Sequence, residues 1–365
     1  MRRYLLWMII LSAMLSGCAA QPAHEPVHVV SPEETELLRL ENRLSQLESL
    51  NVSIQVFTSS AAQASSLYNS AAQVRSVESR YLPFILKQTM DHSGFWGAVR
   101  VMPRHDPNAE LIVEGVILDS DGVALKLFIR ARDATGRIWL EQQYGDFANE
   151  IDYARDPDFR IDPFQDLFNR IANDLVEVQK QLDEKTHDRL LDITMARYAA
   201  ELSPESFAGF IAETESGQLE LLGLPARDDP VFKSVQRIRE SEYLFADAVD
   251  AHYESLYQRV GPTYAWWRYY GYELILGNEK LRRVDATRGA TRGSWYSMER
   301  IYKTYKESKM NEDALRELTN SFDKETEPTI TEIAGKVVQL TGSLDNQYDE
   351  WREILRALYK QQTEL

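Results

Sequence analysis

The turn residues between positions 97 and 147 constrain the fold more than any other feature of this 365-residue chain. Four apolar segments with strand-like alternation lie there, and Asp121-Gly122 and Thr135-Gly136 separate the last three. These dipeptides are typical of antiparallel hairpins, because glycine tolerates the left-handed backbone that a tight turn requires. The pattern therefore predicts an antiparallel sheet in this part of the chain.

Other elements are expected on both sides of these hairpins. Residues 52–57 alternate like a further strand, apolar spacing predicts a helix over 73–92, and Asp162-Pro163 begins a second helix with one apolar face. We therefore expect helices and strands to combine in one α/β domain that ends near residue 186.

Strand patterns nearly vanish after residue 187, and helical patterns replace them. Prolines punctuate these patterns, most clearly at Gly261-Pro262, where we expect a helix to end. The expected helices are 187–201, 203–213, 230–260, 262–284, 294–309, 311–323 and 329–362. The predicted fold class is thus α+β, with a small α/β domain carrying antiparallel hairpins followed by an all-helical domain.

The amino terminus has the pattern of an export signal. Two arginines precede the uncharged apolar run 4–15, which is shorter than the roughly 18–20 residues that cross a bilayer. The next residues, Leu15-Ser16-Gly17-Cys18, resemble the lipobox of bacterial lipoproteins. The resemblance implies cleavage before Cys18, acylation of its thiol and attachment to a membrane. The alternatives are a secretory signal with an unrelated cysteine and a transmembrane anchor.

Cys18 is the only cysteine of the chain, so disulfides and thiolate metal sites within the mature chain are excluded. Ala19 follows it, which resembles lipoproteins sent to the outer membrane. We expect a signal peptide over 1–17, a flexible tether over 18–34, an α/β domain over 35–186 and a helical domain over 187–365. Ser31 is the predicted start of a helix with leucines at 37, 40, 44 and 47. That helix would either lie on its own domain or form a short coiled coil.

The order of elements in the amino-terminal half is strand, helix, antiparallel strands and covering helix. This order resembles small periplasmic α/β domains, such as the amino-terminal domain of the Tol translocation protein B and the lipoproteins that activate penicillin-binding proteins. The resemblance implies a periplasmic body and does not determine its function.

The sequence shows no recognisable catalytic or metal-binding motif. None of its six histidines belongs to an His-Glu-x-x-His frame, and Asp119-Ser-Asp121-Gly122 lacks the later ligands of a calcium loop. No phosphate-binding glycine loop occurs either. We therefore predict no catalytic residues, no metal site and no cofactor.

Two segments are candidate binding sites. The run YAWWRYYGYE, residues 264–273, includes Trp266 and Trp267, whose rings suit sugar stacking or interface contacts, although core packing explains several of the rings equally well. Residues 279–309 carry nine basic and four acidic residues in a chain of net charge −16. The alternative to a binding role is that these basic residues pair with acidic helices of the same chain. The basic candidates are Arg282, Arg283, Arg288 and Arg292.

These observations predict a non-enzymatic, lipid-anchored envelope protein, in the outer membrane and facing the periplasm, that binds or scaffolds another envelope protein or peptidoglycan. The strongly negative chain is unsuited to coating nucleic acid. The alternatives are a peptidoglycan-acting hydrolase with an unrecognised carboxylate pair and an accessory lipoprotein of a transport or export system.

Overall fold

The protein is represented by a computed structural model. It describes residues 27–29, 34–41, 49–59, 69–154, 161–226, 229–288, 329–333 and 336–363. Among them, no helix combines the length and the apolar character needed to span a bilayer.

A mixed seven-stranded sheet forms the centre of the amino-terminal half, in the order β1-β7-β6-β5-β2-β4, with β3 paired to β5. The long strands β5, β6 and β7 are antiparallel, whereas β2 runs parallel to both β4 and β5. The strands are β1 (Val27–Val29), β2 (Val52–Gln55), β3 (Thr58–Ser59), β4 (Val99–Met102), β5 (Leu111–Ser120), β6 (Ala124–Asp133) and β7 (Ile138–Phe147). The predicted hairpin turns are confirmed, since Gly122 and Gly136 have φ values of 92° and 86°.

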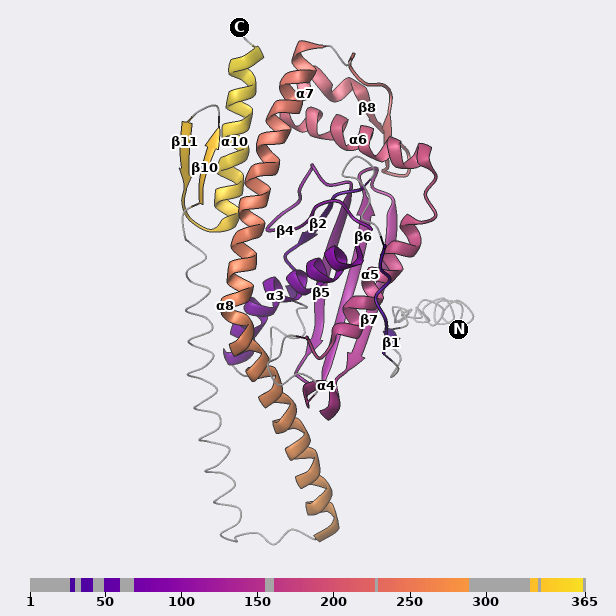
Figure 1. The fold of residues 1–365 in the computed structure, drawn as a ribbon, viewed down its shortest axis with the longest axis vertical. Coiled ribbons are helices and arrows are strands. Elements are labelled where there is room, and N and C mark those ends of the chain that lie inside the picture. The colour runs from indigo at the N-terminus through magenta and orange to yellow at the C-terminus, as the bar shows by residue number, and fades with distance from the viewer. Residues whose placement is uncertain are drawn as a thin grey trace, which may run out of the picture.

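Helices α3 (Asn69–Ser93) and α5 (Gln165–Gln179) pack against each other and cover one face of this sheet (Figure 1). The predicted apolar face of α5 is confirmed, because Leu167, Phe168 and Ile171 are fully buried. The opposite face carries the alternate residues of the long strands, among them Arg130, which pairs with Glu141 at 2.7 Å. A short helix, α4 (Glu150–Ala154), follows β7.

The carboxy-terminal half is mainly helical, so the predicted fold class is confirmed. Its longest element is α8, a helix of 59 residues and about 88 Å that runs along one edge of the sheet and extends past it (Figure 1). The described elements of the carboxy-terminal half are α6 (Glu184–Leu202), α7 (Pro204–Phe207), the 3-10 turn η1 (Ala208–Phe210), β8 (Ile211–Glu213), β9 (Leu219–Leu221), α8 (Pro230–Arg288), β10 (Thr329–Ile333), β11 (Lys336–Leu340) and α10 (Leu344–Thr363).

Three predicted helix boundaries in this half are wrong. Helix α8 continues through Gly261-Pro262, because Pro262 lies on the exposed side of the helix while Val260 and Tyr264 on the other side are buried in the core. The predicted helix 329–362 begins only at Leu344, because the β-branched residues before it form the hairpin β10–β11. The predicted helix 203–213 ends early, and its last residues form β8. The predicted helices 294–309 and 311–323 lie outside the described residues.

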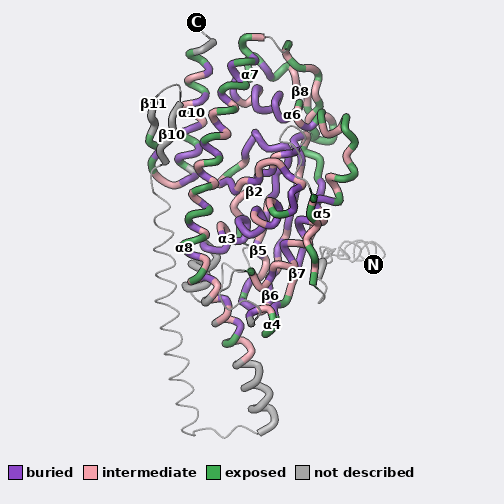
Figure 2. Tube along the Cα trace, viewed as in Figure 1, coloured by how far each residue is buried: buried purple, intermediate pink, exposed green. Residues whose placement is uncertain are grey.

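The two halves share one hydrophobic core. A continuous cluster of buried side chains runs from the sheet through α3 and α5 to α6, α8 and α10 (Figure 2). The approach is closest where the β5–β6 turn meets α8. A Cβ atom placed on Gly271 of α8 would lie 2.9 Å from the backbone oxygen of Asp121, closer than real Cβ contacts. Glycine at this position therefore lets a strand turn and a helix backbone touch directly.

We predict that Gly271→Ala destabilises the protein by about 1–3 kcal/mol, because the added methyl group pushes the turn away from α8. Thermal and urea unfolding measure the loss. The matched control is Gly209→Ala in η1, where no atom lies within 4 Å of the added Cβ, and its stability should stay close to that of the wild type. A Gly271→Ala protein as stable as the control would contradict this account of the contact.

Candidate functional site

A groove with a volume of about 830 Å³ lies between the end of α3, the start of α5 and residues 34–41. This volume falls in the range of small-ligand sites. We call residues 34–41 the strap, because they cross α5 in an extended conformation. The groove is lined by Glu34, Thr35, Glu36, Leu37, Arg39, Gln88, Thr89, His92, Asp152, Ile161, Asp162, Pro163, Gln165, Asp166 and Asn169.

Three polar side chains of α5, which we call the polar ladder, hold the strap in place. Asp166, Asn169 and Asn173 are spaced by three and four residues, so they lie on one face of the helix. Asp166 Oδ1 accepts a hydrogen bond from the Thr35 amide at 3.1 Å, and Asn169 Nδ2 donates to the Thr35 carbonyl at 2.8 Å. Asn173 accepts from the Leu38 amide at 2.8 Å and donates to the Glu36 carbonyl at 2.9 Å. The polar ladder thus supplies hydrogen-bond donors and acceptors to the strap backbone, as a neighbouring β-strand would do.

The predicted helix over this segment is wrong for residues 34–41. Leu37 and Leu38 do pack against the core, as their apolar character suggests, but they do so from an extended backbone. The Leu40 amide also donates to the carbonyl of Ser93 at the end of α3. The backbone hydrogen bonds that a helix would have made internally are here made to α5 and α3. The positions 44 and 47 of the predicted helix lie outside the described residues.

Negative charge dominates the groove. Among the described residues, five carboxylates line it, from Glu34, Glu36, Asp152, Asp162 and Asp166, together with the guanidinium of Arg39 and the imidazole of His92. The carboxyl of Asp146, at the end of β7, has a raised pKa, chiefly because it is buried. Its burial and the carboxylates of Asp166, Asp152 and Asp162 raise its pKa to about 6, although the Phe147 amide opposes the shift.

Asp162 connects the groove to the interior through a buried ion pair. Its carboxylate lies 2.5 Å from Nη1 of Arg268 on α8, and the two side chains are 5% and 1% exposed. The guanidinium also lies over the rings of Phe164 and Tyr264, at 4.5 and 5.1 Å from their centroids. Burial opposes the charge of Arg268, but Asp162 and the neighbouring tyrosines outweigh it, so its pKa is raised. The carboxylate of Asp162 therefore binds α8 through this ion pair.

Two groove side chains that can take part in nucleophilic or acid–base chemistry, Thr89 and His92, are engaged with the backbone. Thr89 Oγ1 donates to the carbonyl of Ile85 at 2.9 Å, and His92 Nδ1 lies 2.6 Å from the carbonyl oxygen of Gln88. Within the described part of the chain, no cluster of three histidine, cysteine or acidic residues is arranged to hold a metal ion. The arrangement is suited to holding an extended chain through its backbone.

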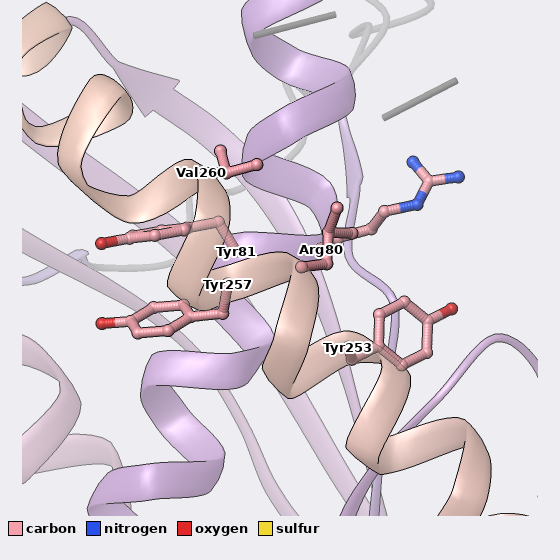
Figure 3. A pocket seen from close by; sticks show the side chains of 6 residues that line it. Arg80, Tyr81, Tyr253, Tyr257 and Val260 are labelled. Carbon is pink, nitrogen blue, oxygen red and sulfur yellow. The ribbon is translucent and has the colours of Figure 1, made fainter. Parts of the chain in front are cut away.

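A second hollow, where α3 meets α8, is much smaller (Figure 3). It has a volume of about 10 Å³, roughly that of one water molecule. The rings of Tyr81 and Tyr257 stack there with centroids 4.6 Å apart, and burial raises the pKa of Tyr81 well above its usual value. This hollow is a packing contact between the two helices.

The structure assigns much of the aromatic run to the core. Tyr264 is fully buried and donates to Glu78 at 2.8 Å, Trp267 is half-buried with its ring 6.1 Å from that of Tyr264, and Tyr272 is buried. The side chain of Trp266 lies outside the described part. Trp267 also packs against the core, and surface binding by Trp266 and Trp267 stays a prediction.

The basic candidates fall at the far end of α8. Arg282, Arg283 and Arg288 occupy its last turns, and their side chains lie outside the described part, as do Arg292 and Cys18 altogether. Sequence reasoning missed Arg268 and the polar ladder. A lone arginine inside an aromatic helical run was the available signal for the first. The spacing of Asp166, Asn169 and Asn173 was the signal for the second.

Comparison with known proteins adds little. No protein-family model matches the chain, and no curated protein matches it. Among solved structures, it is similar to protein XCC0632 from Xanthomonas campestris, described as DUF330, with 10% sequence identity and a TM-score of 0.25. The match covers 43% of this chain and 97% of the other. A TM-score this low supports no argument about fold or function.

We predict that Asn169→Ala combined with Asn173→Ala releases the strap, because the pair supplies three of the hydrogen bonds described above. At about 0.5–1.5 kcal/mol for each bond, the segment should open far more often. Trypsin cleavage after Arg39 and hydrogen exchange at the Leu38 amide measure the opening. Asn346→Ala, which removes an exposed amide on α10, is the control. Equal cleavage rates in both variants would show that the ladder does not hold the strap.

Proposed function

We propose that the protein is a lipid-anchored, non-enzymatic lipoprotein that binds or scaffolds another component of the bacterial cell envelope. The anchor is Cys18, at the end of the lipobox-like segment, and the body lies in the periplasm at the outer membrane. An acyl-modified cysteine suits this role, because each buried methylene contributes about 0.8 kcal/mol and several chains together hold a protein stably.

Helix α8 is the observation that carries the proposal. The helix ends at Arg288, and the structure describes only the backbone of its last turns, from residue 277 on. Figure 1 shows this end extending away from the sheet. Lys280, Arg282, Arg283 and Arg288 belong to this stretch. A helix end that extends away from the sheet and carries cationic residues is suited to contact another macromolecule.

The chemistry of these residues favours an anionic partner. Arginine binds carboxylates and phosphates through two parallel hydrogen bonds. Peptidoglycan peptides, lipid headgroups and acidic envelope proteins all offer such groups. The whole chain is negative, at −16, so attraction has to arise locally and should weaken as salt increases. The groove plays a different part in this proposal, because its polar groups hold the strap.

Cys18→Ala tests the anchor. We expect the variant to accumulate as an unprocessed precursor or to leave the outer-membrane fraction, because no thiol remains to accept the lipid. Cell fractionation and mass spectrometry of the amino-terminal peptide measure both effects. If the variant fractionates and migrates like the wild type, the lipid anchor is wrong and the protein is held by other means.

Arg288→Ala with Arg292→Ala tests the binding role. We expect weaker retention on purified cell-wall sacculi or on an envelope extract, with a change in stability of no more than about 0.5 kcal/mol. The control is Lys233→Ala with Arg356→Ala, which removes two exposed basic residues elsewhere on α8 and α10. Retention that matches the wild type at every salt concentration would remove the basic segment from the proposal. Release of muropeptides from the sacculi would instead favour the hydrolase.

A further inference from the structure

The segment that follows Cys18 is attached to the sheet much earlier than a flexible tether over 18–34 would require. Strand β1 pairs in parallel with β7, with Val27 opposite Gln143 and Val29 opposite Gly145. It forms the outer edge of the sheet, since β7 pairs with β6 on its other side. Val27 is thus the first residue that the structure shows held by the sheet, and residues 19–26 lie between it and Cys18.

This attachment limits how far the body can lie from its anchor. A fully extended chain from Cys18 to Val27 spans about 30–32 Å, and its average end-to-end distance as a flexible chain is about 17 Å. If β1 were unpaired, the first held residue would be Thr35 in the strap. The free chain would then reach about 56–61 Å when extended. Pairing of β1 thus halves the reach of the tether.

The opposite edge of the same sheet is β4, and α8 covers it. Asp250 of α8 accepts a hydrogen bond from the Val101 amide at 2.9 Å, and Asp247 pairs with Arg100 at 2.6 Å. Five strand spacings separate β1 from β4, which is about 24 Å, and packing on that edge places the turns of α8 around Asp247 and Asp250 roughly 30 Å from β1. With the sheet standing on edge, bringing these turns of α8 to the bilayer would therefore require an almost fully extended tether.

We infer that β1 is a clamp on the tether, which directs the β1–β7 edge of the sheet toward the lipid bilayer and the α8 edge away from it. This inference rests on the lipid anchor of the proposed function. Full extension of a flexible chain is entropically unfavourable, so the orientation with α8 away from the membrane is the populated one. The β4 edge and the turns of α8 that cover it then face the periplasm, and the surface beside β1 and β7 faces lipid.

Energy transfer from the protein to labelled lipid measures this orientation. Because Cys18 is the only cysteine and its thiol is consumed by the lipid, an introduced cysteine is the single labelling site. Ile138→Cys at the start of β7 and Leu244→Cys on α8 suit this purpose, since these side chains are 52% and 65% exposed. The mature lipoprotein is placed in vesicles of phosphatidylethanolamine and phosphatidylglycerol that carry an acceptor on the headgroup. We expect clearly more transfer from position 138 than from position 244.

Two further variants test the clamp itself. An insertion of about twenty Gly and Ser residues after Pro22 lengthens the tether and leaves β1 intact. Val27→Pro with His28→Pro removes two consecutive amides of β1. The pairing of β1 with β7 therefore loses a hydrogen-bond donor, whichever of the two amides points toward β7. Both should abolish the difference between the two sites. His28→Thr keeps the amide and favours a strand, so it should retain the difference.

The outcomes separate this inference from the proposed function. Equal transfer from both sites in a vesicle-bound, acylated wild-type chain would overturn the clamp and leave the lipid anchor standing. A difference that survives in the lengthened chain would also overturn it, because orientation would then have another cause. Absence of acyl mass on Cys18, together with no vesicle binding, would overturn the proposed anchor and the clamp with it.

Discussion

The buried pairing of Arg268 with Asp162 is the interaction on which the arrangement of the two halves depends. It joins α8 to the segment that opens α5, and its partners are almost completely removed from water. Removing one member of such a pair leaves an uncompensated buried charge, which typically costs about 3–5 kcal/mol. One turn before Arg268, Tyr264 donates to Glu78 of α3, and Ser120 of β5 donates to the same carboxylate at 2.5 Å. Polar contacts at fixed positions therefore set the register of α8 along the sheet.

A second buried polar group secures the other end of α8. Glu242 is 1% exposed and receives a hydrogen bond from Tyr348 of α10 at 3.3 Å, while Arg352 of α10 lies 3.8 Å from it. Burial raises the pKa of Glu242, and Arg352 opposes the shift. Arg352 also reaches Glu201 of α6 at 2.9 Å. Charged groups that satisfy one another only in this arrangement favour one packing of the helices over alternatives with the same apolar faces.

The hydrophobic pattern and the polar contacts have separate roles in the strap. Leucines at 37 and 38 determine that this segment is buried against the body, whether it is helical or extended. The polar ladder of α5 selects the extended form, because its side chains bond to the amides and carbonyls of Thr35, Glu36 and Leu38. A helix prediction from residues 31–50 considers only local propensity, and the ladder is more than a hundred residues away in the chain.

The sequence by itself determined the elements whose signal is local. Period-two alternation with Asp-Gly and Thr-Gly turns predicted β5, β6 and β7, and the apolar stripe predicted the buried face of α5. It also supplied the lipobox-like segment and the basic run, which remain predictions about function. Only the tertiary structure decided that α8 passes through Pro262, that the strap is extended, that the groove is acidic and that β1 joins the sheet edge. Each of these depends on partners distant in the chain. The local preference of a segment can be overridden when one helix face is buried, when distant side chains bond to the backbone, or when a strand edge is free to pair.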